Sequence, residues 1–375
     1  MNNSAQNSDK TNTPVSQPTT TAQPSTSDQI AKLEEKVNGA HLPPDLLEKS
    51  QGMISRLKLI KGEGSFFLEF DNIARYIDWI AGLPWETFSK DILDLNHAKQ
   101  VLDTNHYGIP DVKQKILEYL SIMILNSQEG MGAGQIARAP IIALVGLVGT
   151  GKTTVAYSIA EALGRKIERI PFGGMGSAMQ LRGQSRFSPE AEPGMVMKAI
   201  RRAGTKNPVI LLDEIDRVSA DARADIMGVL VEMLDPGQNK NFSDHFIDYP
   251  FDLSHVLFIA TSNNTKDIST AVLDRLEIIQ MPSYSDDEKI VIAKTYIFPK
   301  VLKESGLSDH DIAVDDNVWE EIVRPLGYDS GIRSLGRTIQ GMVRRIALFT
   351  LEGRIPQGKG FRVTTENVKQ LIPQW

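Results

Sequence analysis

The stretch "GLVGTGKT", Gly146 to Thr153, decides the fold. It fits the pattern G-x-x-x-x-G-K-[S/T], and it lies between a short apolar run, "PIIALVG" (140–146), and a helical stretch. Glycines let such a loop wrap an anion, because successive backbone N–H groups and the N-terminus of the next helix face a phosphate. The sequence therefore predicts a strand–loop–helix unit that binds the phosphates of a nucleotide.

The phosphate loop assigns a role to several side chains. Lys152 is expected to bridge the β- and γ-phosphates, and the hydroxyl of Thr153 is expected to bind Mg²⁺. The residues expected to contact nucleotide here are Gly146, Leu147, Val148, Gly149, Thr150, Gly151, Lys152, Thr153 and Thr154. The alternative is a glycine turn with a surface lysine. From average residue usage, chance produces this pattern in roughly one chain in a hundred of this length.

An acidic pair follows a second apolar run in "VILLDEID" (209–216). A strand that ends this way places Asp213 beside Mg²⁺ and leaves Glu214 able to polarise a water. Taken alone, the acidic pair is better explained as solvated carboxylates at a strand end. Together with the phosphate loop, it indicates nucleotide hydrolysis. Asn263, at the end of "FIATSN" (258–263), lies where it could orient the attacking water, although an Asn in a turn is common.

Apolar runs alternate with helical stretches after Ala139, which is typical of a parallel sheet covered on both faces. The strand candidates are "PIIALVG" (140–146), "KIERIPF" (166–172), "PVILLDEI" (208–215), "HVLFIATSN" (255–263) and "EIIQMP" (277–282). We therefore expect an α/β fold with a parallel five-stranded sheet. From Ser283 the pattern is again helical and predicts a small all-α lid.

The residues before the sheet read as a polar tail followed by helices. Residues 1–29 have too few apolar side chains to offset the entropy of ordering and are expected to be disordered. Helical spacing then aligns Ile73, Tyr76, Ile77 and Ile80, and later Ile109, Val112, Ile116, Leu120 and Met123. The expected domains are 1–29 (tail), 30–100 (helical segment), 101–282 (nucleotide-binding domain) and 283–375 (lid).

Composition limits the function classes. The 375 residues contain no cysteine, carry a formal charge of −6 and include no apolar run long enough to span a bilayer. We expect a cytoplasmic protein, and the acidic balance argues against a dedicated nucleic-acid binder. Arg201, Arg202 and Lys206 form a small basic cluster that leaves weak DNA association as an alternative, although an ordinary solvated helix end explains the cluster better.

Several separate motifs carry a resemblance to a known family. They are "YIDWIAGLPW", "NHYGIPDVKQKILEYL", "GTKNPVILLDEID", "LDPGQNKNFSDHFIDYPFDLSHVLFIATSN", "VLDRLE" and "YDSGIRSL". With the phosphate loop they make the chain, from about Leu42 to its end, resemble the ATPase module of Lon proteases (ATP-dependent protease La) in the AAA+ superfamily.

This resemblance implies ATP and Mg²⁺ as ligands and adds roles to four sites. Asn263 matches the sensor-1 position, and Arg333 matches the sensor-2 arginine of the lid. Arg275 matches the arginine finger that reaches the ATP of a neighbouring subunit, which implies a homo-hexameric ring. His106, Tyr107 and Gly108 match the loop that borders the adenine. Lys152, Thr153, Asp213 and Glu214 match the phosphate, Mg²⁺ and catalytic positions.

The chain also departs from the family pattern. The resemblance places the protease domain after the last residues and a substrate-recognition domain before the first helices, so we expect neither domain and no peptide hydrolysis from this chain. Its phosphate loop reads "GLVGTGKT", where the family commonly has prolines after the first glycine. That change leaves the anion-binding geometry possible.

A further departure lies in "LRGQSRFSPEAEPG" (181–194). At this place the family has an aromatic–aliphatic pair that pulls polypeptide through the ring, whereas this chain has Ser188 and Pro189. Phe187 is the remaining candidate for substrate contact, because an aromatic ring packs on a chain of any sequence. Two functions stay open. One is a motor that threads protein, perhaps feeding a separate protease, and the other is a regulatory or scaffolding ATPase that threads nothing.

Overall fold

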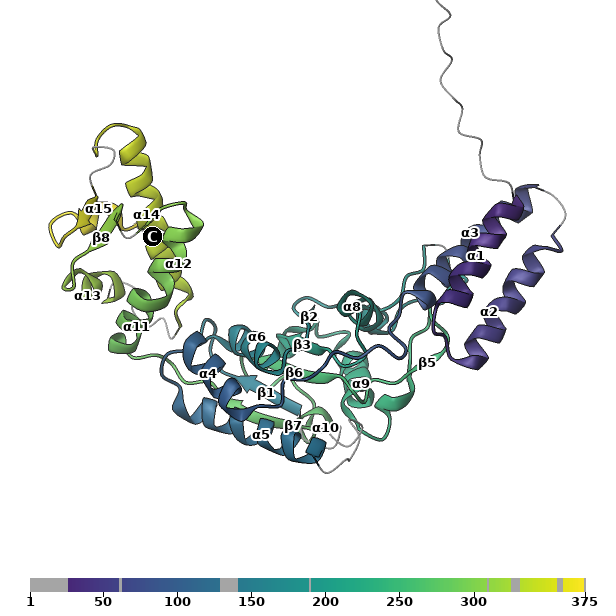
Figure 1. Cartoon of the computed structure of the whole chain (residues 1–375). Helices are drawn as coiled ribbons and strands as arrows, with labels where there is room; N and C mark the ends of the chain where they lie inside the picture. Colours follow the sequence, from purple (N-terminus) through teal and green to yellow (C-terminus); the bar gives the residue numbers. More distant parts are fainter. Residues whose placement is uncertain are drawn as a thin grey trace, which may run out of the picture.

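The computed structural model describes residues 26–60, 63–128, 141–188, 190–308, 310–324, 331–355 and 360–373. A central α/β domain lies between a group of N-terminal helices on one side and a helical lid on the other (Figure 1). No helix within these ranges is long and apolar enough to span a membrane.

The central sheet has five parallel strands in the order β2-β3-β6-β1-β7, as the sequence predicts. Their bounds are β1 Ile141–Val145, β2 Ile167–Pro171, β3 Val209–Asp213, β6 Leu257–Ser262 and β7 Leu276–Gln280. Strands β3 and β6 are buried along their whole length, which explains their continuous apolar sequence.

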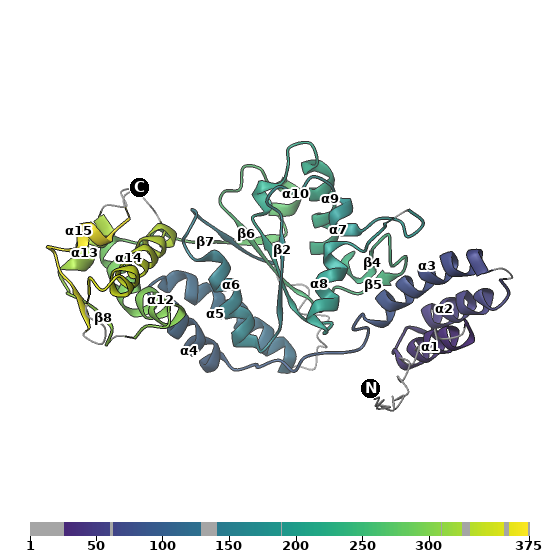
Figure 2. The same ribbon diagram turned by 90° about the horizontal axis from the view of Figure 1, so that it is seen from above.

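Helices cover both faces of this sheet (Figure 2). Ile142 and Leu144 of β1 pack in one core with α4 (Leu95–Asn105), α5 (Pro110–Gln128) and α6 (Lys152–Leu163). Their neighbours Ala143 and Val145 pack on the other face, with α8 (Met195–Ala203) and α9 (Arg223–Leu234). Short elements complete the domain: α7 Met179–Arg182, α10 Thr270–Leu273, the 3-10 turns η2 Ile215–Arg217 and η3 Asn239–Asn241, and an antiparallel pair, β4 Phe242–Ser243 with β5 Pro250–Phe251.

The N-terminal helices are α1 (Thr26–Gly39), α2 (Pro44–Leu57) and α3 (Glu63–Ala81). The predicted helical face of α3 is buried as expected, at Ile73, Tyr76, Ile77 and Ile80. Helix α1 begins at Thr26, so the expected disordered tail ends earlier than residue 29. The helix extends one turn before Ile30, the first of its buried apolar residues, and that polar turn gave no apolar signal. Residues 1–25 lie outside the described residues.

The lid is mainly helical. Helix α11 (Asp286–Ile292) continues through a π-helical turn, η4 (Ala293–Ile297), into α12 (Phe298–Glu304), and α13 (Val318–Val323), α14 (Arg333–Leu351) and α15 (Val368–Leu371) follow. The strands β8 (Ile312–Val314) and β9 (Phe361–Val363) pair in parallel, which corrects the expectation of an all-α lid. Strands of three residues are too short for a period of two to show in the sequence.

Candidate functional site

The phosphate loop joins the end of β1 to the first residue of α6, Lys152. Gly149 and Gly151 have φ values of +85° and +92°, a backbone conformation that favours glycine. A Cβ on Gly146 would lie 2.6 Å from the carbonyl oxygen of Met281, so the start of the loop also requires glycine. The glycine spacing thus builds a tight loop at a helix N-terminus, which is the geometry that binds anions.

Lys152 is buried, and its ammonium group is enclosed by the loop. Its Nζ donates to the carbonyl oxygens of Gly146 (2.7 Å) and Leu147 (2.9 Å) and to Oδ1 of Asn263 (3.1 Å). Burial lowers the pKa of Lys152, while the carboxylates of Asp216, Glu214 and Asp213 oppose that shift. The fold therefore brings Asn263, at the end of β6, to the lysine of the phosphate loop.

Asp213 is the point where several elements meet. Its Oδ1 accepts from Oγ1 of Thr261 (2.5 Å) and lies 3.4 Å from Oγ1 of Thr153. Its Oδ2 accepts from Nε of Arg169 on β2 (2.7 Å). The predicted neighbours Thr153 and Asp213 therefore do lie together. The sequence patterns did not single out Thr261 or Arg169. Thr261 is a polar residue near the end of a buried strand, whereas Arg169 lies in a strand that already contains another charged residue and gives no such signal.

Glu214 follows directly and adopts a left-handed conformation, with φ 59° and ψ 51°. Its backbone N–H donates to Oγ1 of Thr261 (2.9 Å), so one threonine hydroxyl fixes both members of the acidic pair. The carboxylate of Glu214 accepts from Nη1 of Arg217, at 3.2 and 3.3 Å. A non-glycine residue in this conformation is uncommon.

Asp216 is a third residue that the sequence patterns did not single out. Its buried carboxylate accepts from the backbone N–H groups of Asn263 (3.1 Å) and Asn264 (3.4 Å) and from Nδ2 of Asn264 (3.2 Å). It thereby holds the turn that presents Asn263 to Lys152. The final acid of "DEID" was a signal for it, since a buried carboxylate requires hydrogen-bond donors.

A cavity of about 710 Å³ lies between α6 and the lid. It is lined by Gly151 and Thr154 of the loop and helix, by His106 and Tyr107 before α5, and by Arg333 at the start of α14. The lid touches the phosphate loop directly, because the N–H of Ile332 donates to the carbonyl of Gly149 (3.0 Å). The hydroxyl of Tyr284 also lies 3.3 Å from the carbonyl of Thr150.

His106 forms a buried edge of this cavity. Its Nε2 lies 2.9 Å from Oγ of Ser158 on α6. Burial, with a smaller contribution from the Lys113 ammonium, lowers the pKa of His106 to about 4, so the ring is neutral near pH 7. The next two residues complete the predicted loop: Tyr107 lies half-exposed at the cavity, and Gly108 has φ +65°.

Arg275 lies away from this site. Its Nη2 donates to Oδ2 of Asp235 (2.6 Å) and its Nη1 donates to the carbonyl of Ala271 (2.7 Å). Its carbonyl accepts the N–H of Ile141 (3.1 Å) at the start of β1, whereas the phosphate loop follows the other end of that strand. The structure therefore brings Asn263 and Arg333 to the phosphate loop of the same chain but leaves Arg275 outside.

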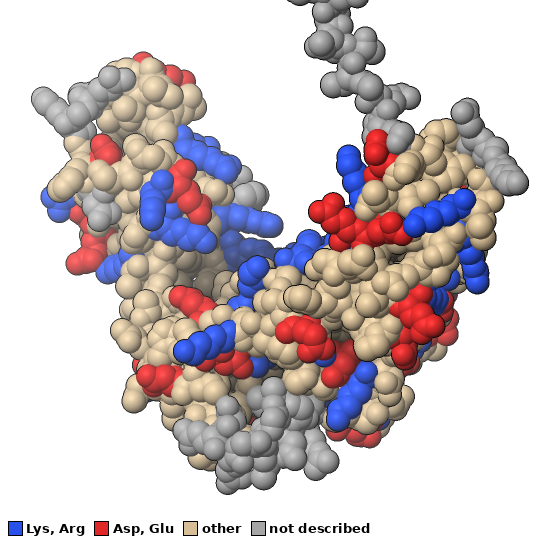
Figure 3. All heavy atoms as spheres, turned by 45° about the vertical axis from the view of Figure 1, so that its right-hand side comes forward, with Lys and Arg blue, Asp and Glu red and all other residues tan. Residues whose placement is uncertain are grey.

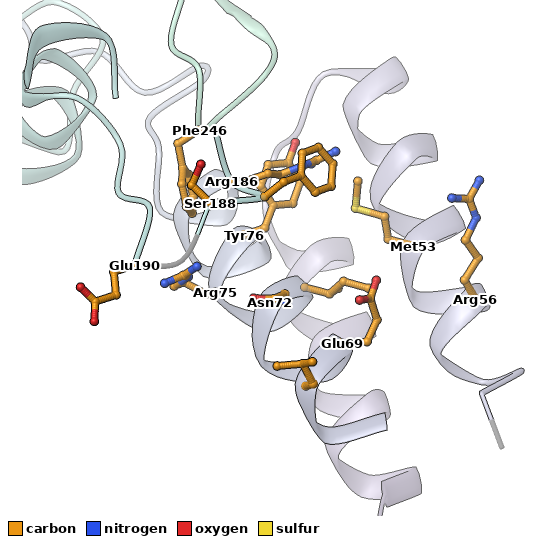
Figure 4. Close-up of a pocket in the computed structure, with 13 residues that line it drawn as sticks. Met53, Arg56, Glu69, Asn72, Arg75, Tyr76, Arg186, Ser188, Glu190 and Phe246 are labelled. Carbon is orange, nitrogen blue, oxygen red and sulfur yellow. The ribbon is translucent and has the colours of Figure 1, made fainter. Parts of the chain in front are cut away.

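The Phe187 loop, residues 181–194, lies against the N-terminal helices (Figure 4). Phe187 is 85% exposed, and Pro189 lies outside the described residues. The guanidinium carbon of Arg186 is 4.6 Å from the ring centroid of Tyr76 on α3 and 5.1 Å from that of Phe187. A cavity of about 620 Å³ opens here, lined by Phe187 and Ser188 together with Met53 of α2.

The basic cluster has partners within the chain. Arg201 pairs with Asp78 (2.7 Å) and stacks over Trp79, and Arg202 pairs with Glu168 (2.7 Å). The Nζ of Lys206 lies 5.8 Å from the ring centroid of Phe88. These contacts favour the structural explanation of the cluster over DNA association.

The site suits a magnesium ion held jointly with a nucleotide. Among the described residues no three His, Cys, Asp or Glu side chains gather into a metal cage. Thr153 and Asp213 instead offer one hydroxyl and one carboxylate beside the phosphate loop. Mg²⁺ is commonly bound in this way, by one or two protein oxygens together with substrate phosphates and water.

The fold and this site define an AAA-type ATPase domain. Residues 142–284 match the family model described as "ATPase family associated with various cellular activities (AAA)". The chain is 41% identical over 345 residues to Lon protease of Lawsonia intracellularis, covering 92% of this chain and 40% of that protein. It is 38% identical over 346 residues to Lon protease of Desulfovibrio desulfuricans (92% of this chain, 38% of that protein) and 39% identical over 343 residues to that of Halothermothrix orenii (92% and 42%).

Residues 142–284 therefore form a domain of the AAA ATPase family, and the chain is similar to the Lon proteases over nearly all of its length. It spans about two fifths of the length of these curated relatives.

Proposed function

We propose that this chain binds and hydrolyses ATP with Mg²⁺ and works in a ring as a protein-remodelling motor. One observation carries the catalytic part of the proposal: Lys152, Thr153, Asp213, Glu214 and Asn263 gather beside the anion-binding loop, although they come from three separate segments. A phosphate-binding lysine, a cation-binding pair and a base beside one loop are the parts that phosphoryl transfer to water requires.

Each side chain has a distinct task in this proposal. Lys152 binds the β- and γ-phosphates from its position in the loop. Thr153 and Asp213 hold Mg²⁺, which neutralises the phosphate charge when it is bound. Glu214 takes the proton of the attacking water as its general base, and Asn263 orients that water.

The cavity beneath the lid supplies the remaining contacts. The neutral ring of His106, with Tyr107 and Gly108, borders the adenine, and Arg333 reaches the phosphates from the lid. Uncharged rings and an apolar border suit a nucleobase, whereas the cations suit its phosphates. The contact between Ile332 and Gly149 supports this arrangement, because it joins the start of α14 to the phosphate loop.

Ring formation rests on the position of Arg275. An arginine supplied across an interface stabilises the charge of the phosphoryl-transfer transition state. Arg275 lies outside the site of its own chain, held by Asp235, and its side chain is 27% exposed. We therefore propose that it acts as a finger in a neighbouring subunit of a homo-hexamer, and that these 375 residues act in the cytoplasm and hydrolyse no peptide bond.

The polypeptide part of the proposal rests on Phe187. Its exposed ring lies at the 620 Å³ cavity between the loop and the N-terminal helices, where it could pack on a bound chain. The alternative is a regulatory or scaffolding ATPase whose nucleotide state controls a partner, and Ser188 at the usual gripping position favours it.

The experiment compares wild type with Phe187→Ala. ATPase activity and oligomeric mass are measured with and without a permanently unfolded protein, and Ser188→Ala serves as the matched control. The motor predicts that unfolded protein stimulates wild type and Ser188→Ala, and that Phe187→Ala removes the stimulation. Absence of stimulation in wild type and in both variants would support the scaffold instead, and equal stimulation of all three would show that Phe187 does not make the contact.

A further inference from the structure

Arg337 lies on α14, one helical turn after Arg333. Both arginines line the 710 Å³ cavity that also includes Gly151 and Thr154 of the phosphate site. Residues four apart project from the same face of a helix. The lid thus presents a second guanidinium group, which the sequence motifs did not single out, to the space that the nucleotide is proposed to occupy.

The charges that line this cavity do not cancel. Glu304 lies 3.9 Å from Lys300 of its own helix. Glu161 of α6 accepts from Nδ2 of Asn105 (2.8 Å). These two glutamates are the acidic residues of the lining, against three basic residues, Lys300, Arg333 and Arg337.

Neither Arg333 nor Arg337 has a carboxylate within 4.0 Å in the part of the chain that the structure describes. Figure 3 shows Lys and Arg side chains gathered on the face of the lid that borders the central hollow. The cavity therefore has an excess of positive charge, which suits a polyanion.

We propose that Arg337 is a second lid arginine that binds the phosphates of ATP. This inference rests on the proposed nucleotide site and extends it. The planar guanidinium group donates two parallel hydrogen bonds to phosphate oxygens and stays charged at every physiological pH. From the lid it would tie closure of α14 over the cavity to the presence of nucleotide.

Binding of a fluorescent ATP analogue in the presence of EDTA tests the proposal without requiring hydrolysis. The variants are Arg337→Gln and Arg337→Lys, and Arg344→Gln is the matched control. Arg344 is exposed on the same helix, but the cavity lining does not include it. Thermal unfolding without nucleotide establishes that each variant is folded.

We expect Arg337→Gln to raise the dissociation constant of the ATP analogue about tenfold, because the variant loses a hydrogen bond to a charged group. Arg337→Lys should lose less, since it keeps the charge but not the paired donors, and Arg344→Gln should bind as wild type does. The inference is overturned if Arg337→Gln binds as wild type, or if Arg344→Gln is weakened equally. A wild-type chain that binds no ATP would contradict the proposed function itself, and this inference with it.

Discussion

At the residue scale, the site depends on how Asp213 is held. Thr261 and Arg169 bind its opposite oxygens, so Oδ1 stays turned toward Thr153. Thr261 also accepts the N–H of Glu214, which adopts a left-handed backbone conformation there. A single hydroxyl on β6 thereby aligns the two carboxylates to which we assign different tasks.

The buried ring of His106 makes stability depend on pH. Its pKa is about 4 in the folded chain, against an ordinary value of 6.5. Between these values the unfolded chain binds more protons, so stability falls as the pH drops from about 6.5 toward about 4. Relative to pH 7.5, the loss at pH 5 from this group is about 2 kcal/mol.

Urea unfolding at pH 7.5 and pH 5 measures that loss. His106→Gln has no titrating ring, so the difference in unfolding free energy between the two pH values should be smaller in this variant by about 2 kcal/mol. His97→Gln is the control, because its position on α4 is half-buried and outside the cavity lining. An identical pH dependence in wild type and His106→Gln would show that the ring is not held neutral.

The sequence predicted the residues that carry a motif and missed those that support them. Lys152, Asp213 and Asn263 follow from glycine spacing and from polar residues at strand ends. Arg169 and Asp216 reach the same place only because β2 lies beside β3 and because η2 turns back toward β6. Such contacts depend on strand order, which local patterns do not encode.

At the element scale, two backbone segments cross closely at the base of the Phe187 loop. Gly183 has φ +75°, and the N–H of Gly194 donates to Oδ2 of the buried Asp244 (2.7 Å). Asp244 also accepts the N–H groups of Phe246 and Ile247. The N–H of His245 donates to the carbonyl of Arg182 at the other end of the loop (2.7 Å), so the exposed Phe187 projects from an ordered base.

Gly194→Ala should disrupt this crossing. A Cβ there would lie 1.9 Å from the carbonyl oxygen of Leu181, so the backbone has to move. We expect a loss of unfolding free energy of about 1–3 kcal/mol, as for other overpacked sites. Urea unfolding measures it.

Gly228→Ala is the control for that substitution. A Cβ at Gly228, within α9, meets nothing within 4 Å. Alanine there should therefore stabilise the helix by about 0.5–1 kcal/mol. Gly194→Ala as stable as wild type would contradict the close crossing.

Secondary structure was predictable where a pattern was long enough. The five strands of the central sheet and the buried faces of α3 and α5 follow from apolar runs and helical spacing. The pairing of β8 with β9 was not predictable, because three-residue strands are too short to show a pattern and the two lie far apart in the sequence. The first turn of α1 was also not predicted, because its residues are polar and become helical through the buried residues that follow.

At the scale of the whole molecule, the nucleotide site lies where the central domain and the lid meet. The loop between β1 and α6 supplies the anion site, and α14 begins against it through Ile332 and Gly149. The Phe187 loop lies instead at the junction with the N-terminal helices, through Arg186 and Tyr76.

The most direct measurement is ATP binding and steady-state ATP hydrolysis by Glu214→Gln beside wild type. Glutamine keeps the size of the side chain and removes the base, so the variant should bind ATP with wild-type affinity. Its turnover should fall by at least about a hundredfold, the range for loss of a general base. Asp225→Asn, on the first turn of α9 and outside the site, is the control. Turnover by Glu214→Gln close to that of wild type would contradict the account.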